Sequence, residues 1–402
     1  MLLSTNLKYS IRSVKTRLTE FRFINFVHIT TKLSKYLLRI FLFLNIKKKH
    51  YIKGRGAQIN THNRFLQHQK IITNEFLNYC EEQGDSSDDF KTTYIKIFPK
   101  TILNKVASPD IGFAYSMNPY QGCEHGCIYC YARNTHEYWG YSAGLDFEQK
   151  ILYKSNAAEL LKKKLSSTRW KPTNIMLSGN TDCYQPIEKK LELTRDILKV
   201  FLKYRHPVSI ISKNALILRD LDILTELNTL NLVHVSISIT SLNENTRRTL
   251  EPRTASVKKR LETVKQLSKN KIPVNVMMAP IIPAINSQEI FEMAKTVYKA
   301  GASSIAYTMV RLNGAIGYIF TNWVRKIYPD RSDKIINQIK NCHGGKLNDS
   351  RFNLRIRGEG NIAHQIQQQF KIAKKKYFAD RCMRPLDYSH YTNGKPEQLK
   401  FF

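Results

Sequence analysis

Three cysteines stand close together at the spacing C-x3-C-x2-C: Cys123, Cys127 and Cys130. No fourth cysteine follows at a matching distance. A structural zinc site is closed by four protein ligands, and a cubane [4Fe–4S] cluster usually takes four thiolates. Three thiolates on a cubane leave one iron open to another ligand. The spacing therefore favours a [4Fe–4S] cluster with an open position, at which chemistry takes place.

Local spacing alone does not fix the metal. A zinc knuckle that combines these cysteines with His125 or with a distant thiol is the alternative. A disulfide framework is disfavoured, because the chain has seven cysteines, an odd number, and its 402 residues are too many to need covalent cross-links.

The segment from Cys123 through Tyr131 resembles the signature of the radical S-adenosylmethionine (radical SAM) superfamily. The resemblance implies that SAM caps the open iron with its amino and carboxylate groups. It also implies that an electron from the cluster cleaves SAM to methionine and a 5′-deoxyadenosyl radical. Tyr129, just before the third cysteine, would lie near the adenine of SAM. In this chemistry the protein supplies binding and orientation.

The chain is strongly basic, with 64 Lys and Arg against 32 Asp and Glu and a net charge of +32. Such a charge attracts polyanions, nucleic acid first and anionic membranes second. The compositional alternative is an A·T-rich genome, which favours Lys without any binding role. The apolar stretch at 36–44 is shorter than the roughly 20 residues of a spanning helix. We expect no membrane span and a cytoplasmic protein.

Strand-like and helix-like segments alternate from residue 111 onward. The expected strands are 111–116, 174–178, 208–212, 233–239, 273–278 and 304–310. The expected helices run from Cys130 to Tyr138 and over 188–204, 218–227, 257–269, 288–300, 318–342 and 358–376. Such alternation implies a parallel sheet. It predicts an α/β fold, a partial (β/α)6 TIM-type barrel, which is also the fold that the radical SAM resemblance implies.

Four regions follow from this pattern. We expect a basic, disordered extension over residues 1–53 and an arm or linker over 54–100. The radical SAM core is predicted over 101–311, followed by a helical C-terminal extension with a flexible tail over 312–402.

In a barrel of this kind the residues after each strand face one mouth. The second predicted strand is followed by Gly179, Asn180, Thr181 and Asp182. Radical SAM proteins place the loop that binds the SAM amino group here, although the common Gly-Gly-Glu form is absent. The resemblance implies cofactor binding by Asp182 and Thr181. A helix N-cap is the alternative role for either residue.

The string Thr-Asp-Cys-Tyr-Gln-Pro-Ile-Glu at 181–188 resembles the spore photoproduct lyase-like branch, also described as DNA repair photolyase-like. Agreement continues at 211–214, 236–240, 251–255 and 279–283. The resemblance implies that Lys213, Ser238 and Arg253 meet the carboxylate and ribose of SAM. Surface ion pairs and strand-end hydrogen bonds are the alternatives.

The same branch suggests three catalytic candidates. Spore photoproduct lyase donates a hydrogen atom to its substrate radical from a cysteine near this strand end, and Cys183 lies close to that place. Tyrosines flank the third cluster cysteine in the lyase, as Tyr129 and Tyr131 do here. Cys183 follows its Thr-Asp pair, however, whereas the cysteine of the lyase precedes the comparable Ser-Asp pair. An inert buried thiol is the alternative.

These resemblances predict repair or modification of nucleic acid, with DNA favoured. Radical chemistry on RNA, a peptide or a small molecule is one alternative, and a non-catalytic iron–sulfur or zinc protein that binds nucleic acid is another. A reducing partner such as flavodoxin or ferredoxin is implied.

The chain ends in Gln398, Leu399, Lys400, Phe401 and Phe402. This end resembles the peptide with which bacterial DNA repair proteins dock on the sliding clamp, and a tail packed on the barrel is the alternative.

Overall fold

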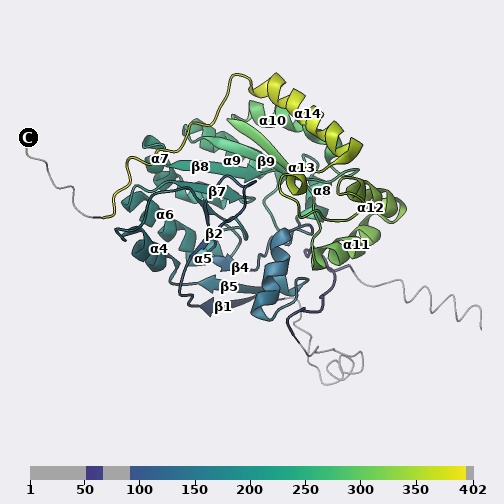
Figure 1. Ribbon diagram of the computed structural model, residues 1–402, viewed down its shortest axis with the longest axis horizontal. Coiled ribbons are helices and arrows are strands. Elements are labelled where there is room, and N and C mark those ends of the chain that lie inside the picture. The colour runs from purple at the N-terminus through teal and green to yellow at the C-terminus, as the bar shows by residue number, and fades with distance from the viewer. Residues whose placement is uncertain (1–50, 67–90, 395–402) are drawn as a thin grey trace, which may run out of the picture. The chain divides into compact units, whose positions relative to one another are not determined.

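The computed structural model describes residues 51–66 and 91–394 (Figure 1). Most of the predicted basic extension, part of the predicted arm and the clamp-like peptide at 398–402 lie outside these ranges. The described residues from Lys53 onward belong to one compact unit. Among them, no helix is both long enough and apolar enough to cross a membrane.

A seven-stranded sheet with the order β10-β9-β8-β7-β6-β3-β2 forms the centre of the fold (Figure 1). Its parallel strands are β3 (Tyr115–Met117), β6 (Ile175–Leu177), β7 (Val208–Ser212), β8 (Val233–Ser238), β9 (Val274–Ile281) and β10 (Ser304–Met309). The edge strand β2 (Leu103–Lys105) runs antiparallel to β3. The described strands thus form an open sheet with six parallel members, which confirms the predicted partial barrel.

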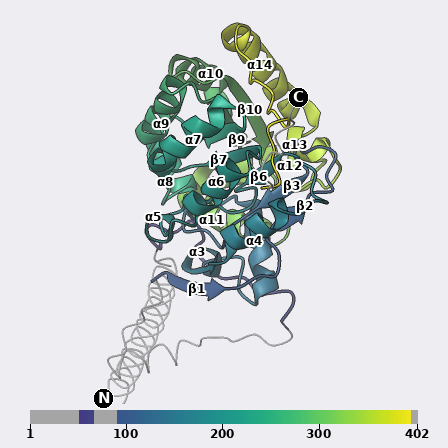
Figure 2. The same cartoon turned by 90° about the vertical axis from the view of Figure 1, so that its left-hand side faces the viewer.

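Helices cover one face of this sheet (Figure 2). They are α4 (Ala157–Leu165), α6 (Leu193–Lys203), α7 (Leu221–Thr229), α9 (Val257–Lys269), α10 (Ile290–Lys299) and α14 (Gly360–Phe378). Every second strand residue points toward them, since side chains alternate along a strand. Val208 and Ile210 of β7, for example, are fully buried in the main core. The alternation that predicted the strands therefore also builds the core.

Two predicted helices are interrupted. The helix expected over 188–204 divides into α5 (Glu188–Leu191) and α6, because Glu192 between them has a positive φ of 51°. The helix expected over 318–342 divides into α11 (Ala315–Ile327) and α12 (Ser332–Asn341). Pro329 lies in the turn between these two, where a proline cannot continue the first helix.

A second, three-stranded sheet was not predicted. It has the order β1-β5-β4, with β1 (Thr93–Ile97), β5 (Lys150–Lys154) and β4 (Tyr120–Gln121). β1 lies in the predicted arm and pairs in parallel with β5, more than 50 residues further along the chain. Such non-local pairing has no local sequence signal. The remaining short elements are η1 (Tyr131–Trp139), α3 (Asp146–Gln149), η2 (Ala215–Asp220), α8 (Glu244–Leu250), η3 (Ser287–Glu289), η4 (Pro329–Arg331) and α13 (Leu354–Arg357).

Candidate active site

The three cysteines lie on one loop, residues 122–130, which we call the cysteine loop. It connects β4 to η1 beyond the carboxyl end of β3, where active sites of α/β barrels are found. Cys123 and Cys127 are buried and Cys130 is half-buried. Gly122 and Gly126 have φ of 77° and 65°, a left-handed conformation that favours glycine. Two turns separate the cysteines: the Gly126 N–H donates to the carbonyl oxygen of Cys123 at 3.4 Å, and the Cys130 N–H donates to that of Cys127 at 3.3 Å.

A fully buried ion pair supports the cysteine loop. Arg133 of η1 donates from Nη2 to Glu148 Oε1 at 2.5 Å, and from Nε to the carbonyl oxygen of Cys127 at 3.0 Å. The Glu148 carboxylate also accepts the backbone N–H groups of Gly56 and Ala57, at 3.1 and 2.8 Å. Arg133 and Glu148 therefore join the predicted arm to the cysteine loop.

The arm packs against the loop so closely that one position requires glycine. A Cβ atom on Gly56 would lie 1.7 Å from the carbonyl oxygen of Gly126. No side chain fits at that distance. The arm therefore supports the cysteine loop directly, in addition to linking the N-terminal residues to the core.

Asp182, after β6, is bound on several sides. Its carboxylate lies 3.3 Å from His125 Nδ1 and accepts the Lys213 N–H at 2.7 Å and the Ser212 hydroxyl at 2.9 Å. Burial raises the pKa of Asp182, but His125 and the hydrogen bonds from the Lys213 and Tyr184 N–H groups outweigh it and lower the pKa to about 2. The ionised carboxylate thus joins the cysteine loop to the ends of β6 and β7. Its contact with SAM stays a prediction.

Thr181 and Cys183, on either side of Asp182, are both buried. The Thr181 hydroxyl donates to the carbonyl oxygen of Tyr120 at 2.6 Å, so cofactor binding by this side chain stays a prediction. Cys183 packs in the main core, and burial raises the pKa of its thiol well above the usual value. A protonated thiol suits a hydrogen donor, but its full burial gives that role no support, and it too stays a prediction.

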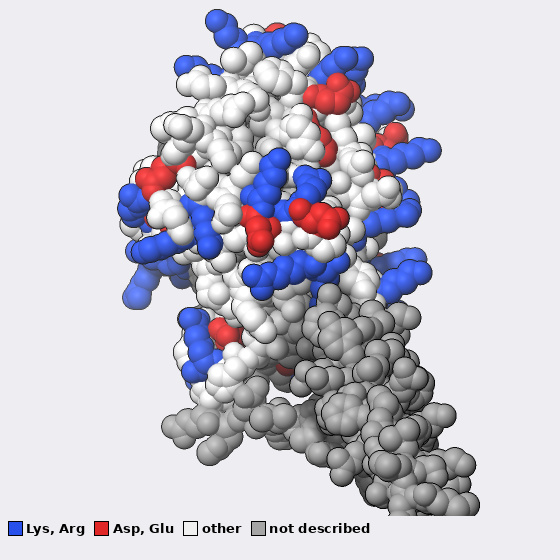
Figure 3. Space-filling view, turned by 90° about the vertical axis from the view of Figure 1, so that its right-hand side faces the viewer, with Lys and Arg blue, Asp and Glu red and all other residues white. Residues whose placement is uncertain are grey.

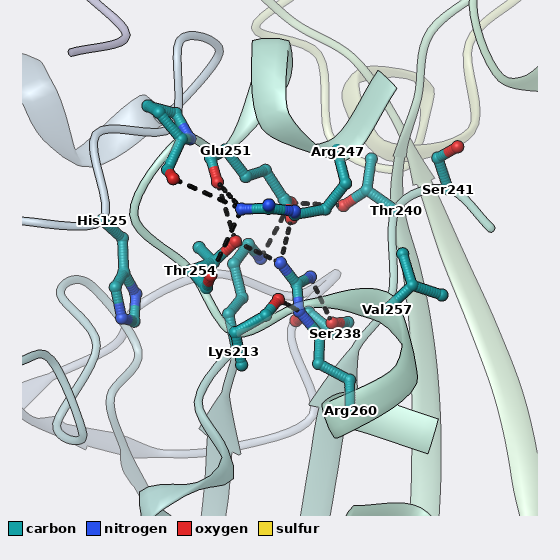
Figure 4. A network of polar contacts seen from close by, with 12 residues as sticks. His125, Lys213, Ser238, Thr240, Ser241, Arg247, Glu251, Thr254, Val257 and Arg260 are labelled. Atoms are coloured by element: carbon teal, nitrogen blue, oxygen red, sulfur yellow. Dashed lines mark hydrogen bonds and ion pairs between the residues drawn. The ribbon is translucent and has the colours of Figure 1, made fainter. Parts of the chain in front are cut away.

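Three of the predicted residues meet around Glu251, which the sequence had not singled out (Figure 4). Tyr129 donates its hydroxyl to Glu251 Oε1, and Lys213 Nζ lies 3.9 Å from the same oxygen. Arg260 donates to Glu251 Oε2 at 2.6 Å and to the carbonyl oxygen of Ser238 at 2.9 Å. This network therefore brings together residues from the cysteine loop and from the ends of β7 and β8.

The charges in this network compensate one another. Burial raises the pKa of Glu251, but Arg260 and Lys213 outweigh that effect and lower the pKa to about 2. Burial, together with the Glu251 charge, raises the pKa of the Tyr129 phenol well above its usual range. Glu251 is therefore an anion that fixes a neutral, donating Tyr129 beside the cysteine loop.

Arg253 and Tyr131 lie nearer the surface. The Arg253 N–H donates to the carbonyl oxygen of His125 at 3.3 Å, and its guanidinium lies 3.6 Å from Glu124 Oε2. Tyr131 is 47% exposed and donates its hydroxyl to the carbonyl oxygen of Gly179. Both residues contact the cysteine loop or its continuation, and Tyr131 connects η1 to the loop after β6.

Comparison with known proteins shows what this chain is similar to. The sequence profile of the Radical SAM superfamily matches residues 117–297. An uncharacterized protein of Mycobacterium tuberculosis is 29% identical over 241 residues, which are 59% of this chain and 71% of that protein. An uncharacterized protein of Methanocaldococcus jannaschii is 29% identical over 248 residues, 62% of this chain and 88% of its own.

Solved structures of spore photoproduct lyase share the fold. The complex with dinucleoside spore photoproduct has a TM-score of 0.50 and 15% identity, over 71% of this chain and 80% of the lyase chain. A mutant with bound AdoMet and the same photoproduct has a TM-score of 0.51, with the same identity and coverage. The fold and the cysteine loop thus resemble those of radical SAM proteins. Residues 117–297 match the Radical SAM superfamily, whose members use a [4Fe–4S] cluster and SAM, and the likeness to spore photoproduct lyase is one of fold.

The donor set fits this cluster. Burial raises the pKa of each of the three thiols, so a bound metal is needed to hold them as thiolates at neutral pH. Among the described residues, no three Cys, His, Asp or Glu side chains are grouped for a single metal ion. Cys123, Cys127 and Cys130 would hold the cluster, which when bound supplies the electron for cleavage of SAM. Tyr129 and the ends of β6 to β8 would orient SAM.

Proposed function

We propose that this radical SAM enzyme acts on nucleic acid, DNA in preference, in a repair or modification reaction. The observation that carries the proposal is the net charge of +32. On the face of the molecule in Figure 3, Lys and Arg side chains occur over much of the described surface, with Asp and Glu side chains between them. A phosphate backbone is the ligand that such a distributed positive surface suits best.

The likeness to spore photoproduct lyase supports the same proposal, because the lyase has been solved with a dinucleoside photoproduct. Radical SAM enzymes need a reductant, and we propose flavodoxin or ferredoxin for this one. Docking on a sliding clamp through residues 398–402 and a cytoplasmic location are further proposals, which rest on the sequence alone.

The test begins with anaerobic reconstitution of the protein with iron and sulfide, followed by dithionite and SAM. We expect 5′-deoxyadenosine to form. Cys127→Ala should lose both the cluster and the product, because a thiolate ligand is missing. Cys342→Ala is the matched control, since Cys342 is a buried thiol outside the cysteine loop and should keep both. A Cys127→Ala protein that still bound a full cluster would mean that Cys127 is no ligand.

The substrate is tested separately with DNA. We expect DNA to change the yield of 5′-deoxyadenosine. We also expect the affinity of the protein for double-stranded DNA to fall with salt: the logarithm of the binding constant should decrease with the logarithm of the salt concentration at a slope of about −0.9 for each phosphate that the protein neutralises. Unchanged SAM cleavage together with weak, salt-insensitive binding would refute a nucleic-acid substrate while leaving the enzyme class intact.

A further inference from the structure

A pocket of about 310 Å³ opens at the β2–β3 edge of the large sheet, beside the cysteine loop. The three cysteines, Lys213, Ser238 and Arg253 do not line it. It adjoins the active site through Gly179, which forms part of its wall and whose carbonyl oxygen accepts the Tyr131 hydroxyl. The pocket is therefore a separate space next to the predicted cofactor site.

The wall of the pocket is rich in amides and carries no charged side chain. Asn104, Asn118, Gln121 and Asn180 all line it. Gln121 Oε1 is shielded from solvent and has no hydrogen-bond partner among the described residues. Asn118 uses its Oδ1 to accept the N–H groups of Asn180 and Thr181, at 2.8 and 3.3 Å, which leaves its amide nitrogen as a donor. Such a wall suits a neutral ligand with both donors and acceptors, and it suits a phosphate or carboxylate poorly.

Aromatic side chains border the same pocket. Trp139 and Tyr138, at the end of η1, line it and are 41% and 69% exposed. Tyr138 stacks on Phe65 of the arm with ring centroids 4.8 Å apart, and Arg64 lies 4.8 Å above the Phe65 ring. Exposed aromatic rings next to a cation are how proteins stack the bases of single-stranded nucleic acid.

We propose that this pocket binds an unpaired base of a nucleic-acid substrate. Trp139 stacks on the base, while Asn118 and Gln121 hydrogen-bond its polar edge, the two contacts by which unstacked bases are recognised. Tyr138, Phe65 and Arg64 continue the surface for the neighbouring nucleotide. The inference rests on the proposed function and adds to it a place on the protein where the strand is held.

The tryptophan fluorescence of the protein itself can report this binding. Its three tryptophans are Trp139, Trp170 and Trp323, and of these only Trp139 is exposed, the others being 8% and 0% exposed. A single-stranded oligonucleotide added to the reconstituted full-length protein should therefore quench tryptophan fluorescence through Trp139. An oligonucleotide of the same length without bases should bind more weakly and quench less. This measurement needs no variant.

Trp139→Ala should bind the base-containing oligonucleotide roughly 5- to 150-fold more weakly, the loss expected for one stacked base. The same variant should no longer distinguish the two oligonucleotides. Phe291→Ala removes an exposed aromatic ring from α10, on the helix-covered face, and is the matched control that should bind as the unaltered protein does.

Two results would overturn the inference in different ways. If the unaltered protein binds both oligonucleotides equally and without quenching, only the phosphate chain is recognised, and the base pocket is refuted while the nucleic-acid function stands. If it binds neither, the nucleic-acid function fails and the pocket inference fails with it.

Discussion

At the scale of single residues, Glu251 connects several parts of the site. It is fully buried, and Tyr129, Thr240 and Arg260 all donate hydrogen bonds to it. A buried carboxylate is tolerated only when it is paired and hydrogen-bonded. Glu251 is therefore the point at which the cysteine loop is fixed to the ends of β7 and β8.

Glu251→Gln keeps the shape of this side chain and removes its charge. We expect a loss of stability of about 3 kcal/mol, because Arg260 is left as a buried cation without a counter-ion. The thermal midpoint and the iron content after reconstitution measure the effect. Glu292→Gln, at an exposed position on α10, is the control and should change neither. Equal behaviour of the two variants would show that the ion pair contributes nothing.

The lowered pKa of Glu251 adds a pH dependence with a defined sign. Its carboxyl has an unfolded value near 4.5 and a folded value of about 2. Its contribution to stability is therefore complete above pH 4.5 and is lost as the pH falls toward 2. Between pH 6 and 8 the destabilisation caused by Glu251→Gln should be constant, and a strong change there would contradict the assignment.

At the scale of elements, the arm and the cysteine loop act as one unit. Gly56 contacts Gly126, and the Glu148 carboxylate binds both the arm and Arg133. We expect Gly56→Ala to lift the arm from the loop at a cost of about 1–3 kcal/mol, typical of an overpacked site. Iron content and proteolysis of the arm measure this. Gly112→Ala, where an added Cβ meets nothing within 4 Å, is the matched control. A normal cluster in Gly56→Ala would refute the coupling.

A second pair of elements spans the open side of the sheet. The loop between β2 and β3 carries Asp110, and α13 carries Arg355, which donates from Nε to Asp110 Oδ2 at 2.7 Å. The second contact of this pair, from Nη2 to Oδ1, is 2.5 Å long, and the Asp110 side chain is only 1% exposed. α13 packs on β10, so the pair joins the two edges of the partial barrel.

Arg355→Gln should release the loop that carries Asp110. We expect amide hydrogen exchange in residues 106–114 to become roughly 30-fold faster, which corresponds to about 2 kcal/mol for a charged hydrogen bond. Lys199→Gln breaks an exposed pair with Asp196 and should leave exchange in this loop unchanged. Identical exchange in both variants would mean that the loop is held by other contacts.

At the scale of the whole molecule, a buried histidine makes stability depend on pH. Trp170 donates to His206 Nε2 at 3.0 Å, and Nδ1 lies 2.8 Å from the carbonyl oxygen of Pro207. Because Nε2 accepts, the proton is on Nδ1 and the ring is neutral. Burial lowers the pKa of His206 to about 4. The unfolded chain binds a proton near pH 6.5, so stability falls as the pH drops from 6.5 toward 4.

We expect His206 to remove about 1 kcal/mol of stability between pH 7 and pH 5.5. Thermal midpoints at the two pH values measure the loss in the unaltered protein. His206→Gln has no titrating ring and should show a smaller decrease between the same two values, although it is less stable at both. An equal decrease in both proteins would assign the pH dependence to other groups.

Much of the fold was predictable because its signals are local. The apolar runs at 208–212 and 233–239 became β7 and β8 nearly unchanged. Ser256, just before the helix expected over 257–269, caps α9 by accepting the Lys259 N–H. β1 and β5 escaped prediction because their pairing joins distant segments and three of the five residues of β1 are exposed. The break at Glu192 was also missed. Thr194 donates its N–H to Glu188 at 3.1 Å, and only the folded chain forms this contact.

The sequence by itself predicts the ligand set, since the spacing of Cys123, Cys127 and Cys130 places three thiols on one short loop. It also indicates the order of the parallel strands of the large sheet, because periodicity is a property of neighbouring residues. Only the tertiary structure decided what surrounds that loop. Glu251 lies 122 residues from Tyr129, and Gly56 lies 70 residues before Gly126. Whether a charge is buried, or whether a position has room for a Cβ atom, depends on which distant atoms the fold brings near. A local sequence pattern contains no information about those atoms.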